Sequence, residues 1–460
     1  MSSWADEELA TLDLGDVRRN ARIKTLVTRM ADRPGGSIPQ TFETPAETMA
    51  AYRALWSEAT DPDAILGAAQ AACLGRVREE RLVLAIQDTT ELDFTHHPGT
   101  TGMGRLKKAD QRARGCLVHT VLAVSADGEP LGHWWQKLWT RDAESESTRD
   151  DWRTRPFDAK ESFRWVEGLR AVHATLPAAT TVVMIADREA DIYEVFAEPR
   201  PVGSELLIRG CYDRRLRDEE QHLWAVVESQ PVVGEQPLLV PRTRGRPPRP
   251  ATLAIRFATV TLAPPHWRPG GVVLPPVTLQ VVLAEEITSP PPGEKPVRWL
   301  LLTTLPVSDL ADALTVLRYY TYRWLVERYH YILKSGCQLE KTQLRTLDRI
   351  QRLLALYCLV ALRLLWMTYS ARVDGDQPCT VAFSDLEWQT AFRYHHGTAP
   401  LPDHPPPLRE AVRWVARLGG FLARKGDGEP GVKVLWRGLT RLQDIVLGVL
   451  LVTQPDLYNG

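Results

Sequence analysis

The sequence predicts an α/β fold in which a mixed sheet is flanked by helical domains at both ends of the chain. Three observations carry this prediction. Apolar runs at 82–87 and 180–186 each end in an aspartate, two alternating runs lie between them, and helical periodicity dominates before residue 70 and after residue 310. A composition of 44% hydrophobic and 25% charged residues over 460 positions is that of a globular chain with a large core, which excludes disordered and fibrous classes.

Charge, cysteine spacing and hydropathy limit the kinds of partner, metal site and cellular location that the sequence predicts. The net charge is −1 and the pI about 6.8, so a nucleic-acid partner would have to bind local basic patches. The six cysteines are scattered without a CxxC pair, and the N-terminal residues do not have the pattern of an export signal, so we expect no disulfide framework or zinc site and a cytoplasmic location. The apolar stretch at 353–369 contains Arg363 and follows an amphipathic helix, so we interpret it as a buried helix and predict no membrane segment.

The first seventy residues predict two helices that carry basic groups. LGDVRRNARIKTLVTRM forms a helix that Asp16 can cap, AETMAAYRALWSE forms a second, and RPGGSIPQTF is a loop between them. The basic side chains are Arg18, Arg19, Arg22, Lys24 and Arg53. Such helices either present a solvated face or contact DNA, and the pattern alone leaves both interpretations open.

From residue 80 the order of elements becomes informative. The strand at 82–87 is followed by CLVHTVLAVS and PLGHWWQKLW, which read as a hairpin turning through Ala126, Asp127 and Gly128. A helix near 159–174, a strand at 180–186, the short helix DREADIYEVFAE and a strand at 205–210 come next. This β-β-β-α-β-α-β order is that of a ribonuclease-H-like core, in which the first and fourth strands lie side by side. Asp88 and Asp187 follow those two strands.

Residues 211–298 predict a β-rich insertion, since they combine Pro, Gly and short strand-like runs, and WLLLTTL at 299–305 resumes strand character. The segment PRTRGRPPR at 241–249 is an Arg/Pro loop. It either follows a phosphate backbone or is a solvated loop tip.

The helix predicted to begin near Leu310 carries four polar residues on one side. At about 100° per residue, Tyr320, Arg323, Glu327 and Lys334 fall within a stripe of roughly 60°. The opposite side is apolar and contains Leu325, Val326, Tyr329, Ile332 and Leu333. An exposed helix with an Arg323–Glu327 pair would give the same pattern.

Together, Asp88, Asp187 and Glu327 predict three carboxylates that converge from separate elements. Such a set can hold two divalent ions for phosphodiester chemistry, and hard oxygen ligands suit Mg²⁺ or Mn²⁺. Each aspartate also has a structural interpretation, because Asp88 can cap a turn and Asp187 can cap the helix that follows it.

These motifs resemble bacterial cut-and-paste transposases of the DDE class, specifically the insertion-sequence-four type (Tn-five-like) with the signature Y-x2-R-x3-E-x6-K. Tyr320, Arg323, Glu327 and Lys334 match its spacing, and further similar blocks are IQDTT, ADREADIY, LGDVRRNARI, AYRALW, WLLLTTLPV, AVRWVARLGGFLARK and VLWRGLTRLQ. The resemblance implies a helical DNA-binding domain at 1–70, a catalytic domain at 71–370 with its insertion at about 211–298, and a helical C-terminal domain at 371–460 that serves dimerisation.

The resemblance also implies roles for single residues. Asp88, Asp187 and Glu327 would hold two Mg²⁺ ions (or Mn²⁺), and Tyr320, Arg323 and Lys334 would contact phosphates. Trp299 would stack on a base rotated out of the helix, although a core Trp is the alternative, and Arg209 would be a further DNA contact.

The implied partners are double-stranded DNA, as terminal inverted repeats and target, and a second copy in a synaptic homodimer. Candidates for its interface, or equally for an intramolecular core, are Leu418, Phe421, Leu435, Trp436, Leu439 and Leu442. A metal-dependent nuclease of the same fold and a domesticated, non-catalytic DNA-binding protein remain alternative functions.

Overall fold

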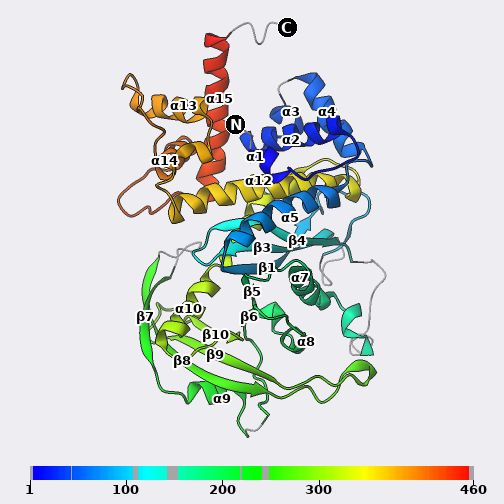
Figure 1. Ribbon diagram of the computed structural model, residues 1–460, viewed down its shortest axis with the longest axis vertical. Helices are drawn as coiled ribbons and strands as arrows, with labels where there is room; N and C mark the ends of the chain where they lie inside the picture. The colour runs from blue at the N-terminus through cyan, green and yellow to red at the C-terminus, as the bar shows by residue number, and fades with distance from the viewer. Residues whose placement is uncertain are drawn as a thin grey trace. The chain divides into compact units, whose positions relative to one another are not determined.

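A computed structural model describes residues 4–42, 44–106, 112–141, 154–217, 220–240 and 248–454. The chain forms two compact units, each built from segments far apart in the sequence (Figure 1). The first comprises Met1–Glu79, Thr89–Glu144 and Leu325–Gly460, and the second comprises Glu80–Asp88 and Ser145–Trp324.

The N-terminal part of the first unit is helical, as predicted. Its helices are α1 (Trp4–Glu8), α2 (Val17–Asp32), α3 (Ile38–Thr41), α4 (Pro45–Trp56) and α5 (Pro62–Glu79). The predicted cap of α2 is confirmed, since the Asp16 carboxylate accepts the Arg18 N–H at 2.8 Å. The predicted loop between the basic helices is wrong in one respect, because Ser37 and Gln40 form a capping box that allows the short helix α3.

A long helix, α12 (Leu347–Val373), forms the apolar centre of the first unit. By length and composition it would be able to cross a membrane, but 83% of its most apolar window is buried inside the unit. It packs against α2, α5 and the C-terminal helices, which fits the predicted buried helix.

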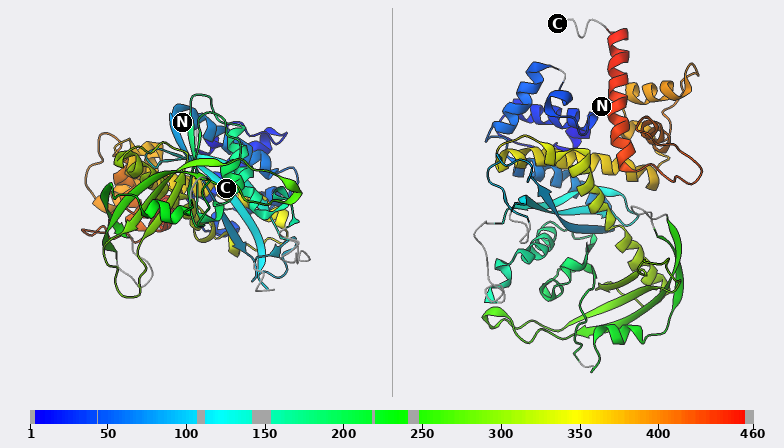
Figure 2. Two further views of the ribbon diagram at one scale, coloured as in Figure 1. Left: turned by 90° about the horizontal axis from the view of Figure 1, so that it is seen from below. Right: turned by 180° about the vertical axis from the view of Figure 1, so that it is seen from behind.

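The C-terminal helices are α13 (Asp385–His396), α14 (Leu408–Leu418) and α15 (Val432–Thr453), and they stay together in both views of Figure 2. Five of the six apolar positions considered for a dimer interface are buried in this unit: Leu418, Leu435, Trp436, Leu439 and Leu442. Phe421 is half-buried. The intramolecular alternative is therefore the one supported at these five positions.

The predicted hairpin in the first unit is confirmed. Strand β3 (Arg114–Ser125) pairs antiparallel with β4 (Pro130–Trp139), and β2 (Gly104–Arg105) pairs with the start of β3. The turn contains Gly128 at φ +93°, a left-handed conformation that glycine adopts without strain.

The second unit contains a mixed sheet in the order β1-β5-β6-β10-β9-β8-β7. Its strands are β1 (Leu82–Asp93, of which Leu82–Asp88 belongs here), β5 (Thr181–Ala186), β6 (Ser204–Arg209), β7 (Gly234–Val240), β8 (Arg249–Leu262), β9 (Val277–Glu286) and β10 (Arg298–Thr303). The predicted neighbourhood of the first and fourth core strands is confirmed, because β1 and β5 pair in parallel.

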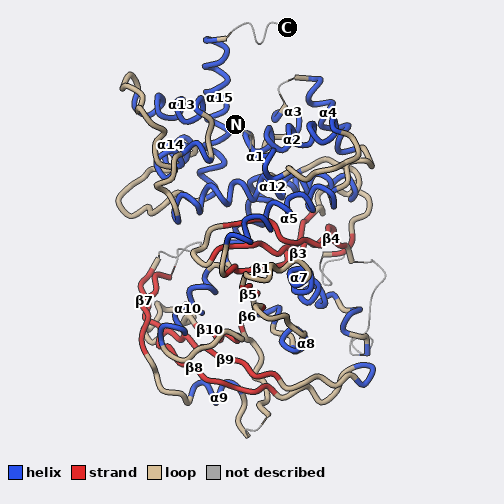
Figure 3. Tube along the Cα trace, viewed as in Figure 1, coloured by secondary structure: helices blue, strands red, loops and turns tan. Residues whose placement is uncertain are grey.

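Helices accompany this sheet, as the blue and red segments of Figure 3 show. They are α7 (Arg164–His173), α8 (Tyr193–Ala197), α9 (Leu223–Glu228) and α10 (Leu310–Thr321). The helix expected near 159–174 begins later, at Arg164, after two short 3₁₀ turns. The predicted helix DREADIYEVFAE is divided into a 3₁₀ turn at Arg188–Ala190 and α8.

The β-rich insertion extends the core sheet. Strands β9, β8 and β7 follow β10 in antiparallel order, and the insertion also contains α9, which sequence periodicity did not indicate. Residues 241–247 of the Arg/Pro loop lie outside the described residues. Arg249, at the end of that segment, forms ion pairs with Glu286 and Glu294 in the sheet.

Candidate active site

Asp88 lies inside strand β1, which continues to Asp93. The prediction that Asp88 ends the strand is therefore wrong, and a turn-capping role does not fit this position. Side chains alternate along a strand, so Gln87 and Asp88 point to opposite faces. Gln87 is buried and its amide donates to the Trp165 carbonyl of α7 at 3.5 Å. Asp88 thus lies on the face away from α7.

Asp187 directly follows the neighbouring strand β5, at the position that the register makes equivalent to Asp88. The parallel register pairs Ile86 of β1 with Ile185 of β5, and each aspartate follows its isoleucine by two residues. Neighbouring strands lie about 4.8 Å apart, so the two carboxylates start from adjacent points of the same edge. Asp187 also caps the next turn, because its Oδ1 accepts the Glu189 N–H at 2.8 Å. The structural interpretation of Asp187 is therefore confirmed, and a cap of this kind uses one of its two oxygens.

Arg323 forms an ion pair with Asp88. Its Nη1 lies 3.6 Å from Asp88 Oδ2, and the side chains are only 8% and 17% exposed. The guanidinium lies 4.9 Å from the centroid of the Trp324 ring. A buried arginine in this position balances the charge of the aspartate and presents a planar set of N–H donors beside it.

Tyr320 is buried next to the same groups. Burial raises the pKa of its phenol; the nearby Arg323 and Arg209 lower it, and Asp187 raises it. The Trp299 ring stands edge-on to the Tyr320 ring with centroids 5.7 Å apart. Arg209 donates to the Arg298 carbonyl at 3.2 Å. Four predicted site residues of the second unit thus lie around Tyr320, namely Arg323, Arg209, Asp187 and Trp299, and Arg323 connects this group to Asp88.

The prediction of one continuous helix through Tyr320 and Lys334 is wrong. Helix α10 ends at Thr321, and α11 (Trp324–Tyr331) follows after i→i−3 hydrogen bonds from Tyr322 and Arg323. A π-helical turn, Ile332–Gly336, then contains Lys334. The apolar side is confirmed, since the five residues assigned to it are buried: Leu325, Val326, Tyr329, Ile332 and Leu333. Because the helix is interrupted twice, Tyr320, Arg323, Glu327 and Lys334 do not form the predicted stripe of roughly 60° on one regular helix.

Glu327 and Lys334 belong to the first unit. Glu327 is half-buried in the first turn of α11, and the Lys334 amine lies 4.0 Å from a carboxylate oxygen of Glu340. That Glu340 carboxylate also accepts the Asp93 N–H at 2.9 Å, which fixes it to the end of β1. No local pattern in the sequence indicated Glu340, because its backbone partner Asp93 is 247 residues away.

Asp191 is a second residue that sequence analysis missed. Its carboxylate is fully buried, accepts the N–H groups of Cys211 and Tyr212 at 2.7 and 3.0 Å, and forms an ion pair with Arg214. These bonds tie the turn after Asp187 to the end of β6. The only sequence signal was a second aspartate four residues after Asp187 in ADREAD.

The donor set fits a hard divalent cation. Asp88 and Asp187 supply carboxylate oxygens, the ligand type that Mg²⁺ and Mn²⁺ prefer. Among the residues that the structure describes, no group of three or more His, Cys, Asp or Glu side chains is arranged to hold a metal ion. Glu327 belongs to the other unit, so the meeting of all three acids stays a prediction.

The N-terminal basic residues differ in their environment. Arg18 and Arg22 are exposed one turn apart on α2, and Arg53 is exposed on α4. Arg19 is half-buried and donates to the Leu14 carbonyl, and Lys24 pairs with Asp6 at 3.5 Å. Of the five basic residues, Arg18, Arg22 and Arg53 are therefore the ones that face solvent.

Family models match almost the whole chain. The model described as "Transposase DNA-binding" matches residues 1–60, "Transposase DDE domain" matches 100–363, and "Transposase Tn5 dimerisation domain" matches 359–453. Among solved structures, a cryo-EM structure of the piggyBac transposase synaptic complex with hairpin DNA is similar over 92% of this chain and 82% of that chain, at 8% identity and a TM-score of 0.38.

Proposed function

The chain belongs to the family of transposases with a DDE domain, and on this premise we propose that it moves a DNA segment by a cut-and-paste reaction at Asp88, Asp187 and Glu327. The observation that supports the proposal is that Asp88 in β1 and Asp187 just after β5 hold equivalent positions in the register of two neighbouring parallel strands. Glu327 would complete the set from α11, within the four-residue signature that it shares with Tyr320, Arg323 and Lys334.

A DDE domain implies dependence on divalent metal, and we propose two Mg²⁺ or Mn²⁺ ions held by the three carboxylates. Bound there, the pair supplies activation of the attacking water or 3′-hydroxyl and stabilisation of the leaving oxygen. The three carboxylates would act as metal ligands and would not themselves transfer the proton of the attacking water or hydroxyl. The cap on Asp187 and the network around Asp191 keep the second aspartate in one orientation.

The phosphate would be gripped by Tyr320, Arg323 and Lys334. Burial raises the pKa of Tyr320, so its phenol stays protonated at neutral pH, and its hydroxyl, which is buried without a hydrogen-bond partner among the described residues, would be free to donate to a phosphate oxygen. Arg323 would exchange its contact with Asp88 for one with a phosphate, because its planar fork matches phosphate oxygens and the aspartate then serves the metal. Lys334 would act as a point charge from the π-helical turn.

The full reaction would have four steps: hydrolytic nicking, attack of the freed 3′-hydroxyl on the opposite strand to form a hairpin, hairpin opening, and joining to target DNA. A base beside the hairpin must leave the stack, and Trp299 would hold it by stacking. Its half-buried ring, packed edge-on to Tyr320, would keep a face for the base.

The working assembly would be a homodimer on two inverted-repeat ends. Arg18, Arg22 and Arg53 would contact the ends, since they are exposed in the segment that matches a DNA-binding model. The last turns of α15 expose Leu451 (46%) and Val452 (82%) within the segment that matches a dimerisation model. We assign the dimer contact to these turns, because the earlier apolar positions are used inside the unit.

The test incubates the purified chain with Mg²⁺ and duplexes that carry candidate ends, and compares wild type with Glu327→Gln. We expect nicks, hairpins and joined products from wild type and none from the variant, which keeps the shape but loses the charge. Glu410→Gln, at an exposed position on α14, is the matched control. Cleavage without joining would favour the nuclease, and binding without cleavage in both proteins would favour the non-catalytic alternative.

A further inference from the structure

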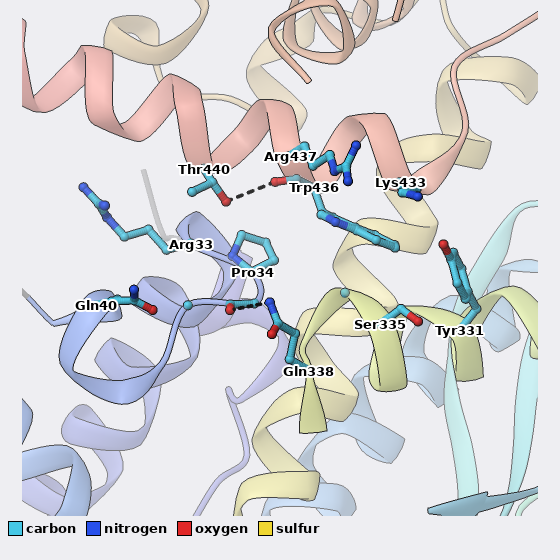
Figure 4. A pocket seen from close by; sticks show the side chains of 13 residues that line it. Arg33, Pro34, Gln40, Tyr331, Ser335, Gln338, Lys433, Trp436, Arg437 and Thr440 are labelled. Carbon is cyan, nitrogen blue, oxygen red and sulfur yellow. Dashed lines mark hydrogen bonds between the residues drawn. The ribbon is translucent and has the colours of Figure 1, made fainter. Parts of the chain in front are cut away.

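A pocket of about 730 Å³ in the first unit contains none of the residues assigned to catalysis (Figure 4). Its walls come from three distant segments: the loop at 33–36 with Gln40, the π-helical turn with Tyr331 and Gln338, and the first turns of α15. The lining is polar and aromatic, which distinguishes the pocket from a packing defect of the core.

The charges of the lining have one sign. Arg33, Lys433 and Arg437 are cationic, and no Asp or Glu is among the lining residues. Arg33 is partly neutralised, since its Nη1 lies 2.8 Å from Asp444 Oδ1. Lys433 and Arg437 are exposed and form no ion pair within the part of the chain that the structure describes. They are one helical turn apart on α15, about 6 Å along its axis.

The floor of the pocket is fixed by close backbone packing. Gly35 has φ +82°, and a Cβ at this position would lie 2.5 Å from the Gly336 carbonyl oxygen. Gln338 Nε2 donates to the Gly35 carbonyl at 2.9 Å, so the loop is held against the π-helical turn. Only glycine allows this approach, and the pocket is therefore a built feature of the fold.

The remaining wall supplies two aromatic rings and a neutral hydroxyl donor. The rings of Tyr331 and Trp436 have centroids 5.4 Å apart and are tilted by 48° to one another. Figure 4 shows both on the same side of the pocket as Ser335, which is exposed. Unpaired cations, a hydroxyl and an aromatic wall match the charged oxygens and the sugar of a nucleic-acid strand.

We infer that this pocket binds the sugar-phosphate backbone of double-stranded DNA independently of sequence, as a contact additional to the N-terminal helices and the catalytic carboxylates. The inference rests on the proposed function, because DNA is its ligand. A chain of net charge −1 has no general attraction for DNA, so local cations without acidic partners matter more for its affinity.

The experiment measures the DNA affinity of the full chain between 50 and 200 mM salt, with one duplex that carries a transposon end and one that does not. The double variant Lys433→Gln/Arg437→Gln removes two phosphate contacts. Each contact contributes about −0.9 to the slope of log affinity against log salt, so the slope should become shallower by about 1.8. The affinity loss over this salt range should then be about 12-fold smaller, equally on both duplexes.

Two controls separate charge from folding. Arg424→Gln/Lys425→Gln removes the same pair of charges from the exposed loop before α15 and should leave the slope unchanged. Lys433→Arg/Arg437→Lys keeps both charges in the pocket and should retain the wild-type slope, which a damaged α15 would not allow.

An unchanged slope in the pocket variant overturns the inference, and so does a change confined to the end-bearing duplex. If wild type still binds and cleaves end DNA in that case, the proposed function stands without the pocket. If wild type binds neither duplex at any salt, the proposed function fails as well.

Discussion

Removal of the Arg214 charge should destabilise the second unit strongly. Arg214 is the charged partner of Asp191, whose carboxylate has no exposed surface, and the Arg214 side chain is itself only 15% exposed. In Arg214→Met the apolar stem can still pack near the rings of Phe196 and Tyr212, so the change removes mainly the charge and its donors. Asp191 then keeps only the two backbone N–H groups of Cys211 and Tyr212.

The magnitude follows from burial. Loss of one member of a buried ion pair costs about 3–5 kcal/mol, because the other charge stays desolvated without its counter-ion. For a unit of this size that corresponds to a fall in Tm of roughly 6–20 °C. The comparison is Arg413→Met, which breaks the Arg413–Glu429 pair, whose side chains are 45% and 39% exposed. An exposed pair contributes under about 1 kcal/mol.

Urea unfolding followed by tryptophan fluorescence measures the loss in free energy of unfolding for Arg214→Met and for the comparison variant Arg413→Met. The double variant Asp191→Asn/Arg214→Met should recover part of the loss, because no charge then remains buried, and a double-mutant cycle measures the coupling. A loss below about 1 kcal/mol in Arg214→Met, or a cycle without coupling, would refute the argument that this pair anchors the turn after Asp187.

Three further predictions concern pH, the hairpin step and assembly. Burial lowers the pKa of His133 to about 4, whereas a histidine of the unfolded chain titrates near 6.5. Between these two pH values the unfolded chain binds a proton that the folded chain does not bind, so the free energy of unfolding should decrease as the pH falls from about 6.5 to about 4. In urea titrations, His133→Leu should make this decrease less steep by up to about 1.4 kcal/mol per pH unit. Trp299→Ala should leave nicking within a few-fold of wild type and reduce hairpin formation by about 5- to 160-fold in gel assays, since stacking of one base contributes about 1–3 kcal/mol, and Trp299→Phe should restore part of it. Leu451→Glu/Val452→Glu should shift the DNA-bound complex from dimer to monomer in sedimentation; a dimer of unchanged affinity would contradict the assignment to the end of α15.

Local chemistry made much of the fold predictable. The hairpin was predictable because Asp127-Gly128 allows a positive φ between two alternating runs, and the start of α2 because Asp16 can accept a backbone N–H there. The parallel pairing of β1 with β5 followed from the order of elements, and it brings Asp88 and Asp187 to one edge.

Long-range partners set the features that the sequence did not indicate. Strand β1 continues beyond Asp88 because it also pairs with β3 of the hairpin, a strand that lies more than twenty residues later in the chain. The insertion strands join the core sheet through β9 and β10, a pairing that no local pattern specifies. Asp191 and Arg214 are 23 residues apart and meet only after β6 is in place.

The break after α10 changes how the signature itself should be interpreted. A helical wheel assumes about 100° per residue, which holds only while every N–H bonds four residues back. Here Arg323 N–H bonds to the Tyr320 carbonyl, three residues back, and Lys334 lies in a π-helical turn, so the phase of the helix shifts twice between Tyr320 and Lys334. The spacing x2, x3, x6 therefore describes three segments, each with its own packing: Tyr320 and Arg323 beside Asp88, Glu327 at the start of α11, and Lys334 facing Glu340. A helical wheel therefore gives the wrong geometry for these four residues, and their shared role at a phosphate stays a prediction, because such chemistry would constrain where the side chains end and not the regularity of the helix that carries them.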